Sequence, residues 1–256
     1  MGEEICWLNG ELLPVEEARI SPLDRGLLYG DGLFETMRAY GGVIFRLDQH
    51  LDRLWEGTLA LRFPYGLDLD YLAEACRHVL WTNELQDAYV RVTVTRGVGG
   101  LPSELAGTER PTGIVTAREF SGYPADVIAR GMTAHVASVR RNPTSPLSQV
   151  KSLNYLDNLL ARAEATDAGA DEALLLDASG HVVEGSSSNI FAVLDGTVTT
   201  PPVSAGVLEG ITRGCVLELC ERLDLPVAEA LFDVAALLSA DEAFLTNSLM
   251  QVMPLV

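Results

Sequence analysis

The stretch from residue 173 to 200 constrains the fold of this chain most, because its residue pattern follows a period of two. LLLD, VVEG and NIFAVLDGTVTT are predicted as short strands separated by turn residues. Asp195-Gly196 stands inside the last of them and is typical of a two-residue β-hairpin loop. The sequence therefore predicts a run of antiparallel strands in the second half of the chain.

Amphipathic helices and further strands surround this stretch. Apolar residues recur at helical spacing in two segments of the first half and again after Gly210, whereas YVRVTVTRG alternates strictly. The turn-rich REFSGYPAD predicts a domain boundary near residue 120. We therefore expect an α/β (α+β) protein with two domains, residues 1–119 and 120–256, with helices at 48–61 and 69–80 and strands at 89–97 and 132–140.

The charge balance limits the partners of the chain. It has 36 acidic and 18 basic residues, a formal net charge of −18. Such a surface repels nucleic acid and anionic membranes, so we expect neither as a partner, and an anionic substrate would need a locally positive pocket.

The sequence also predicts a cytoplasmic protein without a metal site. No apolar run approaches the ~20 residues of a membrane-spanning helix, and the N-terminus lacks the basic start of a secretory signal. The four cysteines and four histidines form no CxxC pair, zinc spacing or HExxH motif.

Lys151 lies in VKSLNYLDNLL, where valine and leucine neighbours predict a buried position between a strand and a helix. A lysine charge is costly to bury without a partner. Tyr155 follows one helical turn later, Glu184 ends the VVEG strand, and the openings at 210–213 and 246–248 could hold a phosphate. An amine, a carboxylate, a phenol and phosphate cradles are the parts of a pyridoxal phosphate site. Taken singly, Lys151 is typical of a surface residue and Glu184 of a loop carboxylate.

Together, these motifs resemble the class IV (fold type IV) pyridoxal-phosphate enzymes, which comprise branched-chain aminotransferases, D-amino-acid aminotransferases and 4-amino-4-deoxychorismate lyases. The resemblance implies a small N-terminal α/β domain, a larger C-terminal pseudo-barrel domain that binds pyridoxal 5'-phosphate, a small-molecule substrate and a homodimer. Family members usually continue beyond the position of Val256, which leaves open whether this chain is truncated or a compact member. The matching stretches, in order, are DRGLLYGDGLFETMR (24–38), HLDRL (50–54), VKSLNYL (150–156), VVEGSSSNIF (182–191), GITR (210–213) and LTNSLMQVMPL (245–255).

The resemblance also assigns roles to individual residues. It implies that Lys151 is the catalytic Schiff-base lysine, that Glu184 pairs with the pyridine nitrogen and that Tyr155 bonds the ring hydroxyl. Arg53 would hold the phosphate with a bidentate guanidinium, although an ion pair on the helix surface is the alternative. The other expected cofactor-binding residues are Ser188, Asn189, Ile211, Thr212 and Ser248.

The substrate side separates the members of the family. Where D-amino-acid enzymes carry an Arg-x-His pair, this chain reads GVGGLP at 97–102. Where branched-chain enzymes read Ser-Gly-Thr-Ala, it reads TNSLM at 246–250, close to the ending of the lyases, and it places Leu249 and Met250 beside the substrate. Tyr89-x-Arg91, by contrast, is similar to a branched-chain motif. The expected substrate residues are Phe34, Arg38, Arg91, Arg96, Asn247 and Leu249.

The resemblance therefore predicts a lyase that converts 4-amino-4-deoxychorismate to 4-aminobenzoate and pyruvate, for folate synthesis. An aminotransferase for D-amino acids or branched-chain L-amino acids is the alternative within the family. A catalytically silent protein that keeps the fold for binding is the alternative of another class.

Overall fold

The computed structural model describes residues 4–64, 66–99, 101 and 110–256. The chain divides into two compact units, Met1–Ser121 with Val150–Asn154, and Gly122–Gln149 with Tyr155–Val256. Residues 150–154 thus group with the first unit, whereas the division expected at 119/120 placed them in the second domain. Gly100 and Pro102 of the GVGGLP loop lie outside the described residues.

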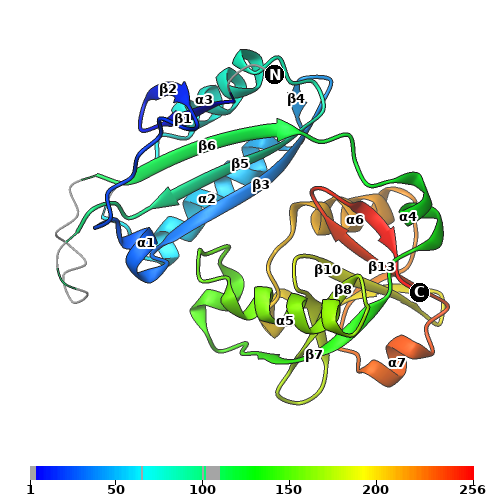
Figure 1. The fold of residues 1–256 in the computed structure, drawn as a ribbon. Helices are drawn as coiled ribbons and strands as arrows, with labels where there is room; N and C mark the ends of the chain where they lie inside the picture. Colours follow the sequence, from blue (N-terminus) through cyan, green and yellow to red (C-terminus); the bar gives the residue numbers. More distant parts are fainter. Residues whose placement is uncertain (1–3, 65, 100, 102–109) are drawn as a thin grey trace. The chain divides into compact units, whose positions relative to one another are not determined.

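The first unit is a six-stranded antiparallel sheet with the order β2-β1-β6-β5-β3-β4. Helices α2 and α3 pack on one face of this sheet (Figure 1). The predicted helices at 48–61 and 69–80 and the strand at 89–97 are confirmed within a few residues. The elements are β1 (Ile5–Leu8), β2 (Glu11–Pro14), α1 (Arg25–Tyr29), β3 (Gly32–Tyr40), β4 (Val43–Ile44), α2 (Leu47–Ala60), α3 (Leu69–Thr82), β5 (Ala88–Thr95) and β6 (Thr112–Glu119).

Alternation along the strands decides which side chains enter the core of this unit. Leu33 and Met37 on β3 are buried under α2 and α3, and so is Val92 on β5. Phe34 and Arg91 occupy the intervening positions, so they lie on the opposite face of the sheet. The sheet therefore separates a hydrophobic core from a face that carries polar groups.

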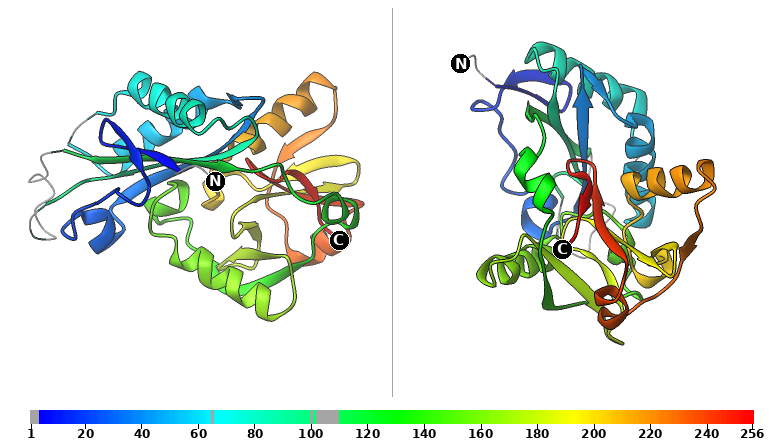
Figure 2. Two further views of the ribbon diagram at one scale, coloured as in Figure 1. Left: turned by 45° about the horizontal axis from the view of Figure 1, so that its top comes forward. Right: turned by 90° about the vertical axis from the view of Figure 1, so that its right-hand side faces the viewer.

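The second unit contains two sheets, with strand orders β12-β11-β10-β13-β14 and β7-β8-β9. Figure 2 shows helices along their outer sides. The elements are α4 (Ala125–Arg130), β7 (Ala134–Arg141), η1 (Pro146–Gln149), α5 (Leu156–Asp167), β8 (Glu172–Asp177), β9 (Val182–Gly185), β10 (Asn189–Leu194), β11 (Thr197–Thr200), η2 (Val203–Ala205), α6 (Ile211–Arg222), β12 (Val227–Glu229), α7 (Val234–Leu238), β13 (Glu242–Asn247) and β14 (Gln251–Pro254).

The hairpin predicted at Asp195-Gly196 joins β10 to β11. Both residues have positive φ angles, 48° and 73°. Such a pair of angles matches the twist of the flanking strands and requires residues that tolerate the left-handed region. The prediction of antiparallel strands from 173 to 200 is confirmed, because β8, β9, β10 and β11 fill this stretch.

The residue pattern after Lys151 predicts a helix whose inner face carries Leu156, Leu159, Leu160 and Ala163, with Ser152 or Asn154 as its N-cap, and helix α5 departs from this prediction. Its buried residues are Asn158, Ala161 and Ala165, whereas the leucines expected on its inner face are exposed. Small residues let α5 approach β7 and β8 closely, which turns the larger side chains outward. Neither Ser152 nor Asn154 caps α5, because the residue at its N-cap is Tyr155. The exposed leucines are Leu156, Leu159 and Leu160.

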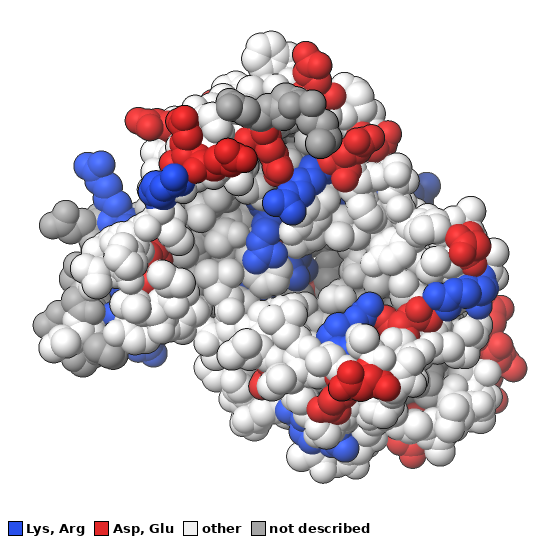
Figure 3. Space-filling view, in the orientation of Figure 1, with Lys and Arg blue, Asp and Glu red and all other residues white. Residues whose placement is uncertain are grey.

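The surface reflects the acidic composition. On the face shown in Figure 3, acidic side chains gather along the top, where β1, β2 and α3 lie in Figure 1. Among the described residues, no helix is both long and apolar enough to cross a membrane.

Candidate functional site

Lys151 extends the sheet of the first unit at the edge of β3. The Phe34 amide donates to the Lys151 carbonyl at 3.0 Å, the Leu153 amide donates to the Gly32 carbonyl at 2.9 Å, and Ser152 bridges to β3. This short antiparallel pairing fixes the backbone of the lysine opposite Phe34. Nζ of Lys151 consequently lies 4.4 Å from the centroid of the Phe34 ring.

Arg91 contacts the same ring. Its Cζ lies 4.0 Å from the Phe34 centroid, and its Nε donates to the Thr93 hydroxyl at 3.3 Å. Diagonal neighbours on adjacent strands are within reach of long side chains. The Phe34 ring thus holds an amine and a guanidinium together by cation–π contacts.

Lys151 is the only lysine of the chain, because every other member of its 18 lysine and arginine residues is an arginine. Arginine can replace lysine as a surface cation, but its guanidinium is always charged and does not serve as the amine nucleophile that lysine supplies. The retained lysine is therefore a strong signal for chemistry at position 151.

Arg53 forms a buried network with Glu35 and His50. Nε and Nη2 of Arg53 donate to Oε1 and Oε2 of Glu35 at 2.8 and 2.7 Å, and Nδ1 of His50 lies 2.7 Å from Oε2. His50 and Arg53 are three residues apart on α2, which places them on one side of the helix. Arg53 is therefore paired with a residue of β3, whereas the alternative was an ion pair with a neighbour on the surface of its own helix.

The same network sets the ionisation of its members. Burial alone raises the pKa of Glu35, but the charge of Arg53 and the hydrogen bonds from His50 and Arg53 outweigh burial and hold that pKa at about 2. Burial lowers the pKa of His50, and Glu35 opposes this only in part. Glu35 is consequently ionised and His50 neutral near pH 7.

The other two predicted arginines of the first unit differ in what they contact. Arg96 is structural: its Nε donates to Asp31 at 2.8 Å and its Nη atoms donate to the carbonyls of Arg62 and Leu61 at 2.9 and 2.7 Å. These bonds tie the end of β5 to the end of α2, and the expected contact of Arg96 with substrate stays a prediction. Arg38 lies on the same sheet face as Phe34 and contacts two aromatic rings. Its Cζ is 4.6 Å from the centroid of the Tyr40 ring and 5.0 Å from that of the Phe120 ring.

Glu184 is the second-last residue of β9 in the second unit and is almost fully buried. Its Oε1 accepts two hydrogen bonds from Arg141, with Nε at 2.9 Å, and its Oε2 accepts the Leu208 amide at 3.0 Å. Arg141 was not among the predicted site residues. A charge-assisted pair of this kind fixes the position of the carboxylate.

Tyr155 stands at the start of α5, and its hydroxyl donates to the Ser186 carbonyl at 2.9 Å. Ser188 and Asn189 follow this turn, and both have protein partners. The Ser188 hydroxyl donates to Glu172 at 3.1 Å, and Nδ2 of Asn189 donates to the Leu208 carbonyl at 2.9 Å. These bonds shape the turn, and the expected contact of Ser188 and Asn189 with the cofactor stays a prediction.

Helix α6 presents its N-terminus beside Asn189. Its N-cap is Gly210, and no side chain among the described residues caps it. A Cβ at Gly210 would lie 1.9 Å from Oδ1 of Asn189, so this contact requires glycine. The first two residues of the helix, Ile211 and Thr212, are half-buried. Their backbone amides are the groups that a phosphate would use.

A buried hydroxyl lies close to this helix end. Thr246 is fully buried, and its Oγ1 has no hydrogen-bond partner among the residues described. Thr246 pairs with Asn189 across β10 and β13, so the two side chains share one face of the sheet. A bound anion would satisfy both the helix end and such a hydroxyl.

The TNSLM segment turns from β13 to β14. Oδ1 of Asn247 accepts the amides of Leu249 and Met250 at 2.9 and 2.8 Å, and its Nδ2 donates to the Ser187 carbonyl at 3.0 Å. Asn247 therefore closes the turn, and its expected contact with substrate stays a prediction. Met250 is buried in the core, contrary to its expected place beside the substrate, whereas Ser248 and Leu249 are half-buried.

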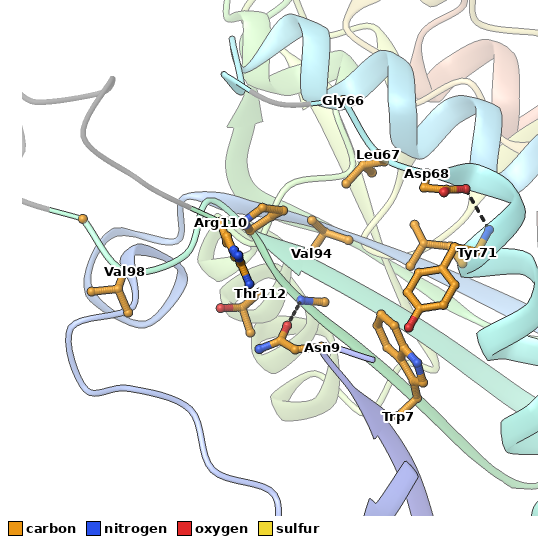
Figure 4. Close-up of a pocket in the computed structure, with 14 residues that line it drawn as sticks. Trp7, Asn9, Gly66, Leu67, Asp68, Tyr71, Val94, Val98, Arg110 and Thr112 are labelled. Atoms are coloured by element: carbon orange, nitrogen blue, oxygen red, sulfur yellow. Dashed lines mark hydrogen bonds between the residues drawn. The ribbon is translucent and has the colours of Figure 1, made fainter. Parts of the chain in front are cut away.

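A separate cavity of about 740 Å³ lies in the first unit (Figure 4). Trp7 and Tyr71 form its aromatic wall, with their rings 5.5 Å apart, and Arg110 and Asn9 line it elsewhere. None of the predicted site residues lines this cavity. It is therefore distinct from the groups gathered around Lys151.

Comparison with known proteins identifies the family. The sequence profile described as amino-transferase class IV matches residues 32–256. The chain belongs to the class IV aminotransferases. Class IV aminotransferases are pyridoxal-phosphate enzymes, and the predicted mixed α/β fold of type IV is confirmed.

Three relatives define its place in this family. A "putative branched-chain-amino-acid aminotransferase" of Methanocaldococcus jannaschii is 41% identical over 97% of this chain and 85% of that protein. The structure of the branched-chain amino acid aminotransferase from Escherichia coli has a TM-score of 0.90 and 31% identity, covering 99% of this chain and 85% of that one. The 4-amino-4-deoxychorismate lyase from Pseudomonas aeruginosa has a TM-score of 0.87 and 35% identity, covering 98% and 90%.

The residues that sequence analysis missed are partners of predicted ones. Glu35, His50, Arg141 and Glu172 each contact a predicted site residue or the turn that follows Glu184. His50 could have been found from its spacing to Arg53 on a predicted helix. The others are joined by tertiary contacts that local spacing does not encode.

Proposed function

We propose that this class IV enzyme binds pyridoxal phosphate through Lys151 and acts as a 4-amino-4-deoxychorismate lyase. The uncapped end of α6 and the buried Thr246 hydroxyl support a phosphate cradle, which Ser248 would complete. Glu184, held by Arg141, offers a carboxylate for a ring nitrogen. When bound, pyridoxal phosphate withdraws electrons from a substrate joined to it through an amine.

Each residue of the chain would have its own task. Arg53 would bind the phosphate with the part of its guanidinium that Glu35 does not orient, and Tyr155 would contact the ring hydroxyl. Lys151 would carry the cofactor and, once released, take the ring proton of the substrate at the carbon that bears the amine. The Phe34 ring would keep the released amine in place for this step.

The face that carries Phe34, Arg38, Arg91 and Lys151 supports an anionic substrate. We call it the cationic face of the first unit. Its three cations are gathered in a chain whose net charge is −18, and two of them contact one ring. Local cations are what a dicarboxylate needs against an unfavourable overall field.

Leu249 is the observation that favours the lyase. It stands half-buried in the β13–β14 turn, where branched-chain enzymes typically have small residues. A large apolar side chain suits a ring better than a flexible chain. Leu249 therefore supports 4-amino-4-deoxychorismate as the substrate.

A branched-chain aminotransferase is the second candidate. It is favoured by the 41% identity to the Methanocaldococcus jannaschii relative and by Arg91, which follows Tyr89 on the cationic face as in the branched-chain motif. Such an enzyme would use a 2-oxo acid as its second substrate.

Parallel assays separate the two candidates. Purified protein loaded with pyridoxal phosphate is given enzymatically generated 4-amino-4-deoxychorismate, and 4-aminobenzoate and pyruvate are measured. The same preparation is then tested with branched-chain L-amino acids or D-amino acids and 2-oxoglutarate. We expect equal amounts of 4-aminobenzoate and pyruvate, with transamination at most a slow side reaction. Rapid transamination of branched-chain L-amino acids without 4-aminobenzoate would show that the second candidate is correct, whereas rapid transamination of D-amino acids would contradict both candidates.

We also propose a homodimer in the cytoplasm. The exposed leucines of α5 form an apolar helix face, and contiguous exposed apolar surface is typical of a protein interface. The four cysteines are free thiols, which suits a reducing compartment.

A further inference from the structure

Glu172, the first residue of β8, is a fully buried carboxylate without a task in the proposed function. Its Oε1 accepts hydrogen bonds from the Ser186 hydroxyl and from Nη1 of Arg162 at 3.1 Å. Its Oε2 accepts the hydroxyls of Ser187 and Ser188 at 3.2 and 3.1 Å. Burying a polar group costs free energy unless it is hydrogen-bonded, and these donors meet that condition for both carboxyl oxygens.

The turn from Gly185 to Ser188 is built around this carboxylate. The Gly185 amide donates to the Ser188 carbonyl at 2.7 Å, and the Ser186 amide donates to the Ala173 carbonyl at 2.9 Å. A Cβ at Gly185 would lie 2.1 Å from the Ser188 hydroxyl and 3.3 Å from Cδ of Glu172. Glycine at position 185 is therefore needed for the hydroxyls to converge on Glu172.

The turn directs its carbonyl groups at site residues. The Ser186 carbonyl accepts the Tyr155 hydroxyl at 2.9 Å and Nδ2 of Asn158 at 2.8 Å. The Ser187 carbonyl accepts Nδ2 of Asn247 at 3.0 Å. Since Ser186 is held by Glu172 on one side and holds Tyr155 on the other, a defined chain of contacts joins the buried carboxylate to the phenol.

We propose that Glu172 is a positioning residue for the cofactor site, which acts through Ser186 to fix the hydroxyl of Tyr155. The inference rests on the proposed function, because it takes Tyr155 to contact the cofactor. It explains why three consecutive serines follow Gly185. Their hydroxyls donate to Glu172, and the backbone carbonyl of Ser186 accepts the Tyr155 hydroxyl.

A double-mutant cycle on cofactor affinity tests this inference. Apoprotein is titrated with pyridoxal phosphate for the wild type, S186A, Y155F and the S186A/Y155F pair, after circular dichroism has shown that each is folded. We expect S186A to weaken binding by about two- to tenfold, the usual effect of one hydrogen bond. In the Y155F background, S186A should change the affinity little, because the group that it positions is already absent.

Two further variants complete the design. E172Q keeps the shape of the side chain and should weaken cofactor binding in the wild-type background. In the Y155F background, E172Q should change the affinity little, as is expected for S186A. S187A removes another hydroxyl that donates to Glu172. The carbonyl of residue 187 accepts Asn247 rather than Tyr155, so the effects of S187A and Y155F on cofactor affinity should add. If S186A and E172Q weaken binding equally with and without Tyr155, Glu172 is merely structural and the inference is wrong, while the proposed function stands. If the wild type does not bind pyridoxal phosphate at all, the proposed function fails as well.

Discussion

Glu35 is fully buried, and it stays ionised because Arg53 and His50 lie against it. Its pKa of about 2 in the folded protein is below the ordinary value of 4.5. The ionised form therefore stabilises the fold at every pH above 4.5, and this contribution is lost as the pH falls from 4.5 towards 2. The difference between the two pKa values corresponds to a contribution of roughly 3 kcal/mol from Glu35 to the free energy of unfolding.

Glu35→Gln should reveal this contribution directly. At pH 7 we expect urea denaturation to show a loss of about 3 kcal/mol, because the substitution leaves Arg53 partly buried without its carboxylate. The difference from the wild type should shrink as the pH falls below 4.5. A difference that stays constant between pH 7 and pH 3 would contradict the ionised state of Glu35.

His50 should act in a separate pH range. Because burial lowers its pKa from 6.5, the unfolded chain takes up a proton first, and the wild type should lose stability as the pH falls below 6.5. His50→Gln should remove this loss of stability, but the loss below pH 4.5, which comes from Glu35, should remain. Identical profiles between pH 7 and pH 5 for the variant and the wild type would show that His50 is not held neutral.

Single residues differ in how far the sequence reveals them. Lys151 and Glu184 could be singled out because each belongs to a local sequence motif, VKSLNYL and VVEG, and their roles toward the cofactor stay predictions. The partners of Arg53 and Glu184 could not, since Glu35 lies 18 residues from Arg53 and Arg141 lies 43 residues from Glu184. These pairs form only when separate strands and helices pack, and no local period records that.

At the scale of elements, the N-terminus of α6 depends on Gly210. Gly210→Ala should destabilise the protein by about 1–3 kcal/mol, because its Cβ would meet Asn189 at 1.9 Å. It should also weaken binding of pyridoxal phosphate, since the helix end would shift. Thermal melting and cofactor titration measure the two effects.

Gly214→Ala is the matched control in the same helix. A Cβ at Gly214 would meet no atom within 4 Å, so alanine should stabilise the helix by about 0.5–1 kcal/mol. Cofactor affinity should not change. If the two substitutions affected cofactor affinity equally, the helix end would not be part of the phosphate cradle.

The elements also show where periodicity is a sufficient guide. Helices α2 and α3 have wide apolar faces against one sheet, and their ranges were predicted closely. In α5 the same reasoning chose the leucine face, whereas the helix buries Ala161 and Ala165. Spacing alone cannot tell which of two apolar faces meets the core, because close packing of small residues can exclude the larger ones.

At the scale of the whole molecule, the leucine face of α5 predicts self-association. Leu160 is 58% exposed, and Leu160→Gln should convert a dimer into a monomer in analytical ultracentrifugation. Leu238→Gln on α7 is the control, since Leu238 is 83% exposed and lies outside that face. A wild-type monomer, or a dimer that survives L160Q unchanged, would contradict an interface at α5.

The central claim is that Lys151 carries the cofactor, and the single lysine makes this claim directly testable. Protein incubated with pyridoxal phosphate is reduced with borohydride, digested and analysed by mass spectrometry, with Lys151→Ala treated in parallel. We predict one modified lysine per chain, in the peptide that contains VKSLNYL, and a K151A variant that folds but has no turnover. A wild type that remains unmodified after reduction, or a K151A variant with normal turnover, would contradict the account.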